Sequence, residues 1–140
     1  MRKVSAFLAA LAILAAPAAA QTSTPRQMMR ALGAVPSDRE VQRAVERAAG
    51  QPLGSRLNPV RVSAPSGEHE YIARLRCGDG TAPGVGQRSN AGEGPFGTII
   101  DVYPLDCGEA TPRRFELAMD MYHDDHVETR APEGFTLAPK

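Results

Sequence analysis

The segment Thr98-Ile-Ile-Asp-Val-Tyr-Pro-Leu-Asp-Cys107 is rich in β-branched residues and predicts a strand. Apolar side chains fall at alternate positions, and Asp101 interrupts that series. Successive side chains of a strand point to opposite faces, so alternate residues share one face. The residues of this parity are Ile99, Asp101, Tyr103, Leu105 and Cys107. We expect this face to lie toward the core.

Further strand signals lie on both sides of this segment. They are Val60-Arg61-Val62, the alternating stretch Glu70 to Cys77, and Phe135-Thr136-Leu137. The stretch Arg113 to Tyr122 fits either a strand or a helix, because its apolar residues match both periods in part. Its stricter alternation favours the strand.

One helix is clearly marked. Ser37-Asp38-Arg39-Glu40 is a capping box, and apolar residues follow it at helical spacing. Gly50 and Pro52 then end the pattern. We predict a helix over about 38–49. A shorter helix could begin at Thr24-Pro25, within a leader that spans 21–36.

These patterns together predict an α+β fold. The capped helix, about 38–49, should pack on a small, mainly antiparallel β-sheet with one disulfide. The segment 37–140 is long enough for a single domain with one core.

Residues 1–20 have the features of a cleavable secretory signal peptide. Arg2 and Lys3 precede an apolar stretch, and Ala18-Ala19-Ala20 offers small residues for cleavage. The apolar stretch is too short for a bilayer, which needs about 20 residues, and no later segment is apolar enough. We expect a periplasmic or extracellular mature chain that begins at Gln21 and has no integral membrane segment.

The charge of the chain is balanced, with 16 Lys and Arg against 16 Asp and Glu. Loss of Arg2 and Lys3 with the signal peptide would leave the mature chain slightly acidic. This balance argues against nucleic acid as a partner, since phosphate backbones are bound by basic surfaces.

Cys77 and Cys107 are the only cysteines. In an oxidising compartment an even number of cysteines favours a disulfide over a metal site or a nucleophile. The Cys-x-x-Cys spacing of redox-active pairs is absent. We therefore predict a structural disulfide between Cys77 and Cys107.

The segment 120–128 is the strongest candidate site. His123, Asp125 and His126 could hold a divalent metal such as zinc, with His69 as a further ligand. No motif such as His-Glu-x-x-His supports this metal, so a polar turn is the simpler interpretation. One of these histidines could also act as a general acid or base, although no nucleophile is identifiable beside it.

Three arginines are candidate ligand-binding residues. Arg74 and Arg76 alternate on one predicted strand, and Arg88 lies in the glycine-rich stretch 78–97. Guanidinium groups bind carboxylates and phosphates, although a solvated sheet face would also explain the first two. The letters Gly92-Glu-Gly-Pro-Phe-Gly97 match a dinucleotide-binding motif but precede a strand, so we do not assign that function.

Four segments resemble small exported proteins of alphaproteobacteria to which no activity is attached. They are Asn58-Pro-Val-Arg61, Arg74-Leu-Arg-Cys-Gly-Asp-Gly80, Gly94-Pro-Phe-Gly-Thr-Ile-Ile-Asp-Val-Tyr103 and Asp120-Met-Tyr-His123. The resemblance implies a compartment and a size, and it assigns no functional residue.

Two functional hypotheses follow. The first is a non-catalytic binding or envelope-associated module, whose partner is a small ligand or an envelope protein. The second is a metal-binding protein or metal-dependent hydrolase that uses the segment 120–128. The missing catalytic motif favours the first, without a cofactor.

Overall fold

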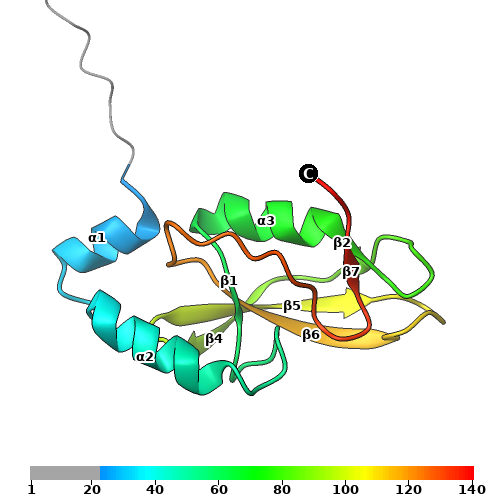
Figure 1. The fold of residues 1–140 in the computed structure, drawn as a ribbon. Helices are drawn as coiled ribbons and strands as arrows, with labels where there is room; N and C mark the ends of the chain where they lie inside the picture. The colour runs from blue at the N-terminus through cyan, green and yellow to red at the C-terminus, as the bar shows by residue number, and fades with distance from the viewer. Residues whose placement is uncertain (1–22) are drawn as a thin grey trace, which may run out of the picture.

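The computed structural model describes residues 23–140, so the predicted signal peptide lies outside the described residues. The helices are α1 (Pro25–Ala31), α2 (Asp38–Ala48) and α3 (Ala64–Arg74). The strands are β1 (Val60–Arg61), β2 (Leu75–Arg76), β3 (Gly84–Val85), β4 (Ser89–Glu93), β5 (Ile99–Asp106), β6 (Arg114–Asp120) and β7 (Thr136–Leu137). Figure 1 shows α3 on one side of the main sheet and α2 on the other. The predicted α+β class is confirmed, although the described chain contains more than one helix.

Strand β5 is the centre of the main sheet. It pairs antiparallel with β6 on one side, whereas β4 and β3 share its other side. Strand β1 adds a parallel pair to the outer side of β6, with Val60 opposite Met119. Strands β2 and β7 form a separate antiparallel pair. The sheet is therefore mixed but mainly antiparallel, as expected.

The main core lies between this sheet and α3. Tyr103 and Leu105 of β5 lie on the same face as Leu117 and Met119 of β6, and all four are buried. Tyr71, Ile72 and Leu75 pack against them from the other side. The predicted inward face of the segment 98–107 is confirmed from Asp101 to Leu105, whereas Ile99 is 37% exposed.

The strand expected over Glu70 to Cys77 is wrong for most of its length. Residues up to Arg74 belong to α3, and only Leu75–Arg76 is a strand. The buried residues Glu68, Tyr71, Ile72 and Leu75 follow the spacing of one helical face. Because the helical series begins with the charged residue Glu68, its spacing was hard to recognise in the sequence. The alternation of apolar and polar residues within 70–77 was easier to see and predicted a strand.

The expected helix and the other strands are confirmed. Residues 113–122 contain β6, residues 135–137 contain β7, and the leader contains α1. In α2, Ser37 Oγ accepts a hydrogen bond from the Glu40 backbone N–H, and Glu40 Oε2 accepts one from the Ser37 backbone N–H. This reciprocal cap fixes the start of α2, whose Ala44 and Ala48 pack against Phe96.

Substitution Ser37→Ala should lower the free energy of unfolding by about 1 kcal/mol, because a helix N-terminal donor loses its acceptor. Urea denaturation of the two proteins measures the difference. Ser23→Ala, at an exposed position before α1, is the control and should change stability by less than about 0.5 kcal/mol. Equal losses in both variants would contradict the capping role.

The glycine-rich stretch 78–97 is more ordered than a single loop, since it includes β3 and β4. Its last glycines make the tight turn into β5. A Cβ at Gly94 would collide with Ile100, and Gly97 has a φ of +76° and lies against Pro36. The Gly92–Gly97 motif is thus a turn before a strand, as its sequence context indicated.

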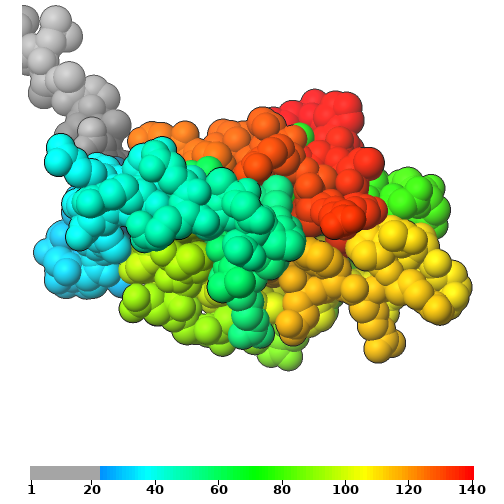
Figure 2. Space-filling model, turned by 60° about the horizontal axis from the view of Figure 1, so that its bottom comes forward, coloured from blue at the N-terminus to red at the C-terminus, as the bar shows by residue number. Residues whose placement is uncertain are grey.

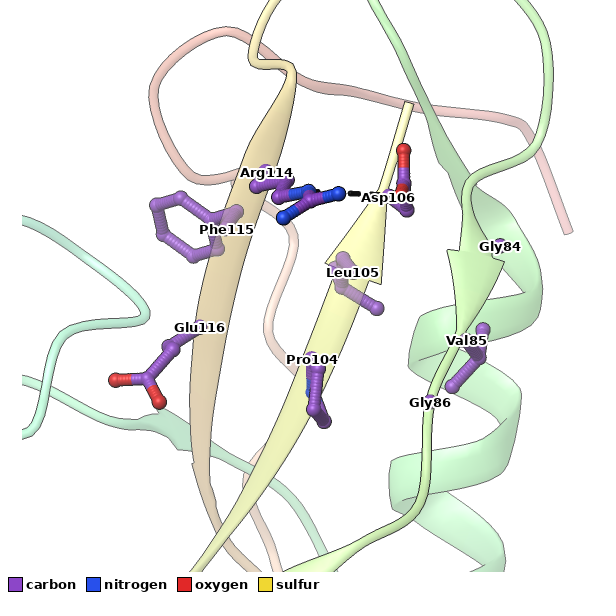
Figure 3. Close-up of a pocket in the computed structure, with 9 residues that line it drawn as sticks. All are labelled: Gly84, Val85, Gly86, Pro104, Leu105, Asp106, Arg114, Phe115 and Glu116. Atoms are coloured by element: carbon purple, nitrogen blue, oxygen red, sulfur yellow. Dashed lines mark ion pairs between the residues drawn. The ribbon is translucent and has the colours of Figure 1, made fainter. Parts of the chain in front are cut away.

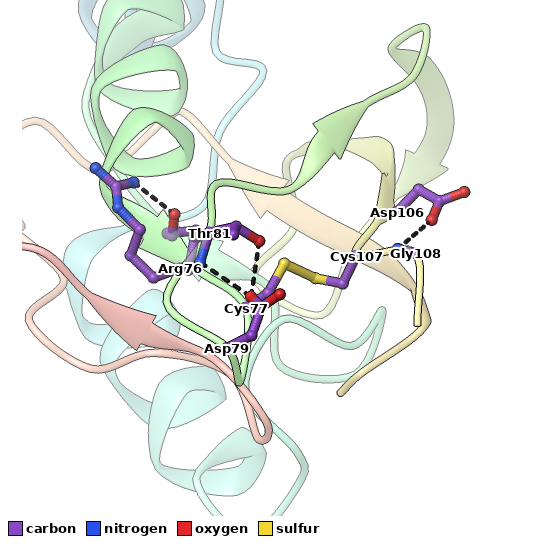
Figure 4. The surroundings of a disulfide bond; sticks show 8 residues. Arg76, Cys77, Asp79, Thr81, Asp106, Cys107 and Gly108 are labelled. Atoms are coloured by element: carbon purple, nitrogen blue, oxygen red, sulfur yellow. Dashed lines mark hydrogen bonds between the residues drawn. A yellow bond between two sulfur atoms is a disulfide. The ribbon is translucent and has the colours of Figure 1, made fainter. Parts of the chain in front are cut away.

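The predicted disulfide is confirmed. Cys77, which follows β2, is bonded to Cys107 at the end of β5, with a Cα–Cα distance of 5.8 Å (Figure 4). Next to it, the Thr81 backbone carbonyl accepts a hydrogen bond from the Cys77 N–H at 2.8 Å. The bond joins the small β2–β7 pair to the main sheet.

The described N-terminal helices lie together at one end of the molecule, beside the residues of β4, and the C-terminal segment lies toward the other end (Figure 2). Within residues 23–140, no helix has the length and apolar character needed to span a membrane.

Candidate functional site

Polar side chains gather where β6 ends, around Asp120. This carboxylate is fully buried. Its Oδ2 accepts a hydrogen bond from Thr98 Oγ1 at 2.5 Å, and its Oδ1 accepts one from the Tyr122 backbone N–H at 3.0 Å. Nε2 of His123 lies 3.4 Å from the same Oδ2. Buried charges are costly unless they are paired, so Asp120 organises the groups around it.

Asp120 belongs to an acidic cluster that also contains Glu68 of α3 and Asp101 of β5. Tyr103 donates a hydrogen bond from its hydroxyl to Glu68 Oε2 at 2.8 Å. Nη1 of Arg88 lies 3.2 Å from Asp101 Oδ2 and 3.9 Å from Glu68 Oε2. One half-exposed guanidinium therefore faces two buried carboxylates.

Burial raises the pKa of two carboxyls in this cluster, Glu68 and Asp101. It raises the pKa of Glu68 to about 7, with a further increase from Asp101, against the lowering effects of the Tyr103 hydrogen bond and of Arg88. Burial also raises the pKa of Asp101, although Arg88 opposes the change. Glu68 Oε1 has no hydrogen-bond partner among the described residues, which is compatible with a carboxyl that holds a proton near neutral pH.

A polar cavity of about 470 Å³ lies beside this cluster. We call it the His–Arg cavity. It is lined by Arg26, Gln27, Arg30, Asp38, Val41, Gln42, Val45, Arg61, His123, Asp124, Asp125 and His126. Its walls therefore come from α1, α2, the end of β1 and the segment after β6.

Both histidines of the cavity have a buried carboxylate behind them. His123 Nε2 faces Asp120, and His126 Nε2 lies 3.5 Å from Glu128 Oε2. Burial would raise the pKa of Glu128, but side-chain and backbone hydrogen bonds from Arg130 outweigh it and lower that pKa to about 2. Burial and the nearby Arg61 lower the pKa of His126, whereas Glu128 opposes the change.

The three arginines of the cavity differ in their pairing. Nη2 of Arg26 and Nη2 of Arg30 lie 2.8 and 2.6 Å from the same oxygen of Asp38. Arg61 is half-buried and makes no ion pair within residues 23–140. Burial lowers its pKa, although an arginine stays protonated at physiological pH. Arg61 thus has no carboxylate at ion-pair distance among residues 23–140, although Glu128 and Asp120 attract its charge from further away.

Helix α1 is held against the cavity by specific contacts. Thr24 Oγ1 donates to Asp124 Oδ2 at 2.7 Å, and Arg26 Nη1 donates to the Tyr122 carbonyl at 3.0 Å. Arg26 is only 7% exposed despite its charge. The segment expected to be a leader is therefore one wall of the candidate site.

The structure brings three of the predicted metal ligands to one cavity. His123, Asp125 and His126 line it, whereas His69 is exposed on α3 and does not. Within residues 23–140, no group of three or more metal-ligating side chains is arranged to hold an ion. The metal site stays a prediction.

The three predicted ligand-binding arginines lie in different surroundings. Arg74 Nε donates to the Ala138 carbonyl at 2.9 Å, and Arg76 Nη1 donates to backbone carbonyls of its own segment. These two bonds tie down the chain near β2 and β7. Of the three, only Arg88 joins the acidic cluster around Asp120, where it pairs with Asp101.

A second cavity, of about 610 Å³, is larger but chemically poorer. Figure 3 shows it on the sheet near β3, with Pro104, Val85 and Phe115 among its lining residues. Its charged groups include Arg114 and Asp106, an exposed pair 3.7 Å apart. The charged residues that line it, Asp106, Arg114 and Glu116, are all exposed. We therefore place the candidate site at the His–Arg cavity, which holds two histidines and the half-buried Arg61.

Several site residues had no clear signal in the sequence. Arg61 was visible only as the polar middle of a short strand, and Glu68 only as a neighbour of His69. Asp101 did leave a signal, because it interrupts the apolar face of its strand. Arg26 left none, because its partners are distant in the sequence.

Comparison with protein families, with curated proteins and with solved structures found no match for this chain.

Proposed function

We propose that this protein is an exported module that binds a small phosphate-bearing ligand in the His–Arg cavity. The observation that carries the proposal is Arg61, a half-buried guanidinium without an ion-pair partner among the described residues, in a cavity with two histidines. Guanidinium groups match phosphate oxygens in charge and geometry, which makes arginine a favoured phosphate ligand.

The cavity lining holds as many acidic as basic side chains, with Arg26, Arg30 and Arg61 against Asp38, Asp124 and Asp125, so the positive charge that supports an anionic ligand is local. Asp38 neutralises one of the two arginines it contacts, so the Arg26–Asp38–Arg30 group has an excess positive charge. Asp124 already accepts a hydrogen bond from Thr24. Each proton bound by His123 or His126 adds positive charge. A cavity of this kind suits one phosphate group better than a long polyanion.

Export is the second part of the proposal. The features of residues 1–20, the Cys77–Cys107 bond and the resemblance to exported alphaproteobacterial proteins support it. Disulfides of this kind persist mainly in oxidising compartments. Mass spectrometry of the protein recovered from the periplasm should show a chain that begins at Gln21, and an unprocessed N-terminus would contradict export.

The metal-dependent alternative has weaker support. His123, Asp125 and His126 share the cavity, but each histidine directs Nε2 at a buried carboxylate that is not one of the predicted ligands. Within residues 23–140, no group of three or more such side chains is arranged to hold a metal ion.

Substitution Arg61→Gln should weaken binding of inorganic phosphate at least about tenfold, because a charge-assisted hydrogen bond contributes roughly 1.5 to 3 kcal/mol. Isothermal titration calorimetry at constant ionic strength measures the affinity of residues 21–140. Arg56→Gln is the matched control, since Arg56 is exposed, does not line the cavity and pairs only loosely with Glu116 at 3.8 Å. Equal phosphate affinity in all three proteins, or no binding by any, would contradict the proposal.

A further inference from the structure

Helix α1 lies at one end of the molecule and has no apolar anchor there (Figure 1). Within residues 23–140, the buried clusters of apolar side chains include no residue of α1. Met28 of α1 and the C-cap residue Leu32 are 53% and 78% exposed. Apolar burial is the main favourable contribution to packing. The position of α1 therefore depends on polar contacts.

Two hydrogen bonds attach the start of α1 to the segment after β6. Thr24, the N-cap of α1, donates from Oγ1 to Asp124 Oδ2 at 2.7 Å. Arg26 Nη1 donates to the Tyr122 backbone carbonyl at 3.0 Å. Asp124 lines the His–Arg cavity, and Tyr122 precedes the cavity residue His123 in the chain. The groups that hold α1 thus border the cavity.

Ion pairs attach α1 to α2. Asp38 Oδ1 lies 2.8 Å from Arg26 Nη2 and 2.6 Å from Arg30 Nη2. The Asp38 side chain is 75% exposed, and exposed ion pairs contribute little to stability because water and salt screen them. This attachment is therefore weak on its own.

The connection after α1 allows the helix to leave its position. Gly33 has a φ of +67°, and no heavy atom beyond its chain neighbours lies within 4 Å of the place where a Cβ would stand. Glycine adopts positive and negative φ values about equally, so this connection is free to change direction. Helix α1 has 7 residues, and an isolated helix in water needs about 12 to 15 residues to be stable. We expect α1 to unfold when its contacts break.

We propose that α1 is a lid of the His–Arg cavity, which opens by local unfolding and is held closed by a bound phosphate group. The lid supplies Arg26, Gln27 and Arg30 to the cavity, whereas Arg61 comes from β1. Only the closed lid brings the three arginines together. A phosphate that contacts arginines of both parts binds the closed state more tightly and shifts the population toward it. The inference concerns regulation of this site and rests on the proposed phosphate binding.

Hydrogen–deuterium exchange of residues 21–140 tests the lid, with inorganic phosphate as the probe and sodium chloride holding the ionic strength constant. The backbone N–H groups of Met28 and Leu32 donate to the Thr24 and Met28 carbonyls, so their exchange reports the unfolding of α1. Without phosphate they should exchange at least about tenfold faster than the amides of β5 and β6, because local opening costs less free energy than global unfolding. A ligand that binds only the closed state should slow them about 100-fold at a concentration of 100 times Kd.

Two acidic variants test the attachment of the lid. Asp124→Ala removes the acceptor for Thr24 and should speed exchange of α1 at least about fivefold without phosphate. Asp125→Ala is the matched control, since it removes the same charge from the cavity lining at an exposed position. It should change exchange of α1 by less than about twofold. Protection of β5 and β6 in the same data shows that each variant is folded, and equal exchange of α1 in the two variants would contradict this attachment.

Two results would overturn the lid and leave phosphate binding intact. In one, calorimetry shows that phosphate binds, but the amides of α1 exchange as slowly as those of β5 and β6, so α1 opens only with the whole fold. In the other, the amides of α1 exchange rapidly but at the same rate with and without phosphate. A protein that binds no phosphate would overturn the proposed function, and the inference with it.

Discussion

Reduction of the Cys77–Cys107 disulfide is expected to lower the free energy of unfolding by about 3 to 4 kcal/mol, because the bond closes a loop of 30 residues in the unfolded chain. For a domain whose net stability is roughly 5 to 15 kcal/mol, this is a large fraction. Guanidinium denaturation of residues 21–140 with and without a phosphine reductant measures the change.

A cysteine-free variant provides the control for this experiment. Cys77 is buried, so Cys77→Ala with Cys107→Ala avoids leaving a hydroxyl without a partner. The double variant should match the reduced wild type within about 1 kcal/mol and should not respond to the reductant. An unchanged denaturation midpoint on reduction of the wild type would show that the bond contributes no stability.

The second large effect concerns Glu68. Its pKa is about 7 in the folded protein and 4.5 in the unfolded chain, so the folded state holds the extra proton between these values. Stability from this group is fully present below pH 4.5 and is lost as pH rises through 7. One pKa unit corresponds to about 1.4 kcal/mol, so the loss should reach roughly 3 to 4 kcal/mol by pH 8.

The variant Glu68→Gln isolates this effect. Glutamine keeps the shape and can still accept the hydrogen bond from Tyr103, but it does not titrate. Urea denaturation from pH 4.5 to 8 measures the free energy of unfolding of both proteins. The decrease for Glu68→Gln should be smaller than that for the wild type, and the difference should equal the loss predicted for the Glu68 carboxyl. Glu70→Gln, at an exposed position on the same helix, should retain the wild-type pH dependence. Parallel curves for wild type and Glu68→Gln would contradict the raised pKa.

The sequence could predict the elements whose signals are local. The start of α2 was predictable because Ser37 and Glu40 satisfy each other's backbone within four residues. The central strand β5 was predictable from its β-branched residues and alternation, and the disulfide from the number of cysteines and the expected export. Each of these signals depends on neighbours in the chain or on compartment alone.

Helix α3 shows where local signals were insufficient. Tyr71 and Leu75 fit both a helical and an alternating pattern. In the structure they pack against β5 and β6, and this packing favours the helix over the strand. The burial of Glu68 follows from that choice, since the helix places it opposite Tyr103, 35 residues away in the sequence. A strand over the same residues would have put Glu68 in the preceding turn.

The candidate site divides in the same way. The sequence by itself determined that His123, Asp125 and His126 lie together after a strand, because they are close in the chain. Only the tertiary structure decided what surrounds them, since Arg26 and Arg61 reach the cavity from α1 and β1. It also placed a buried carboxylate behind each histidine. Pairing across the fold depends on how helices and strands pack, and a local pattern does not contain that information.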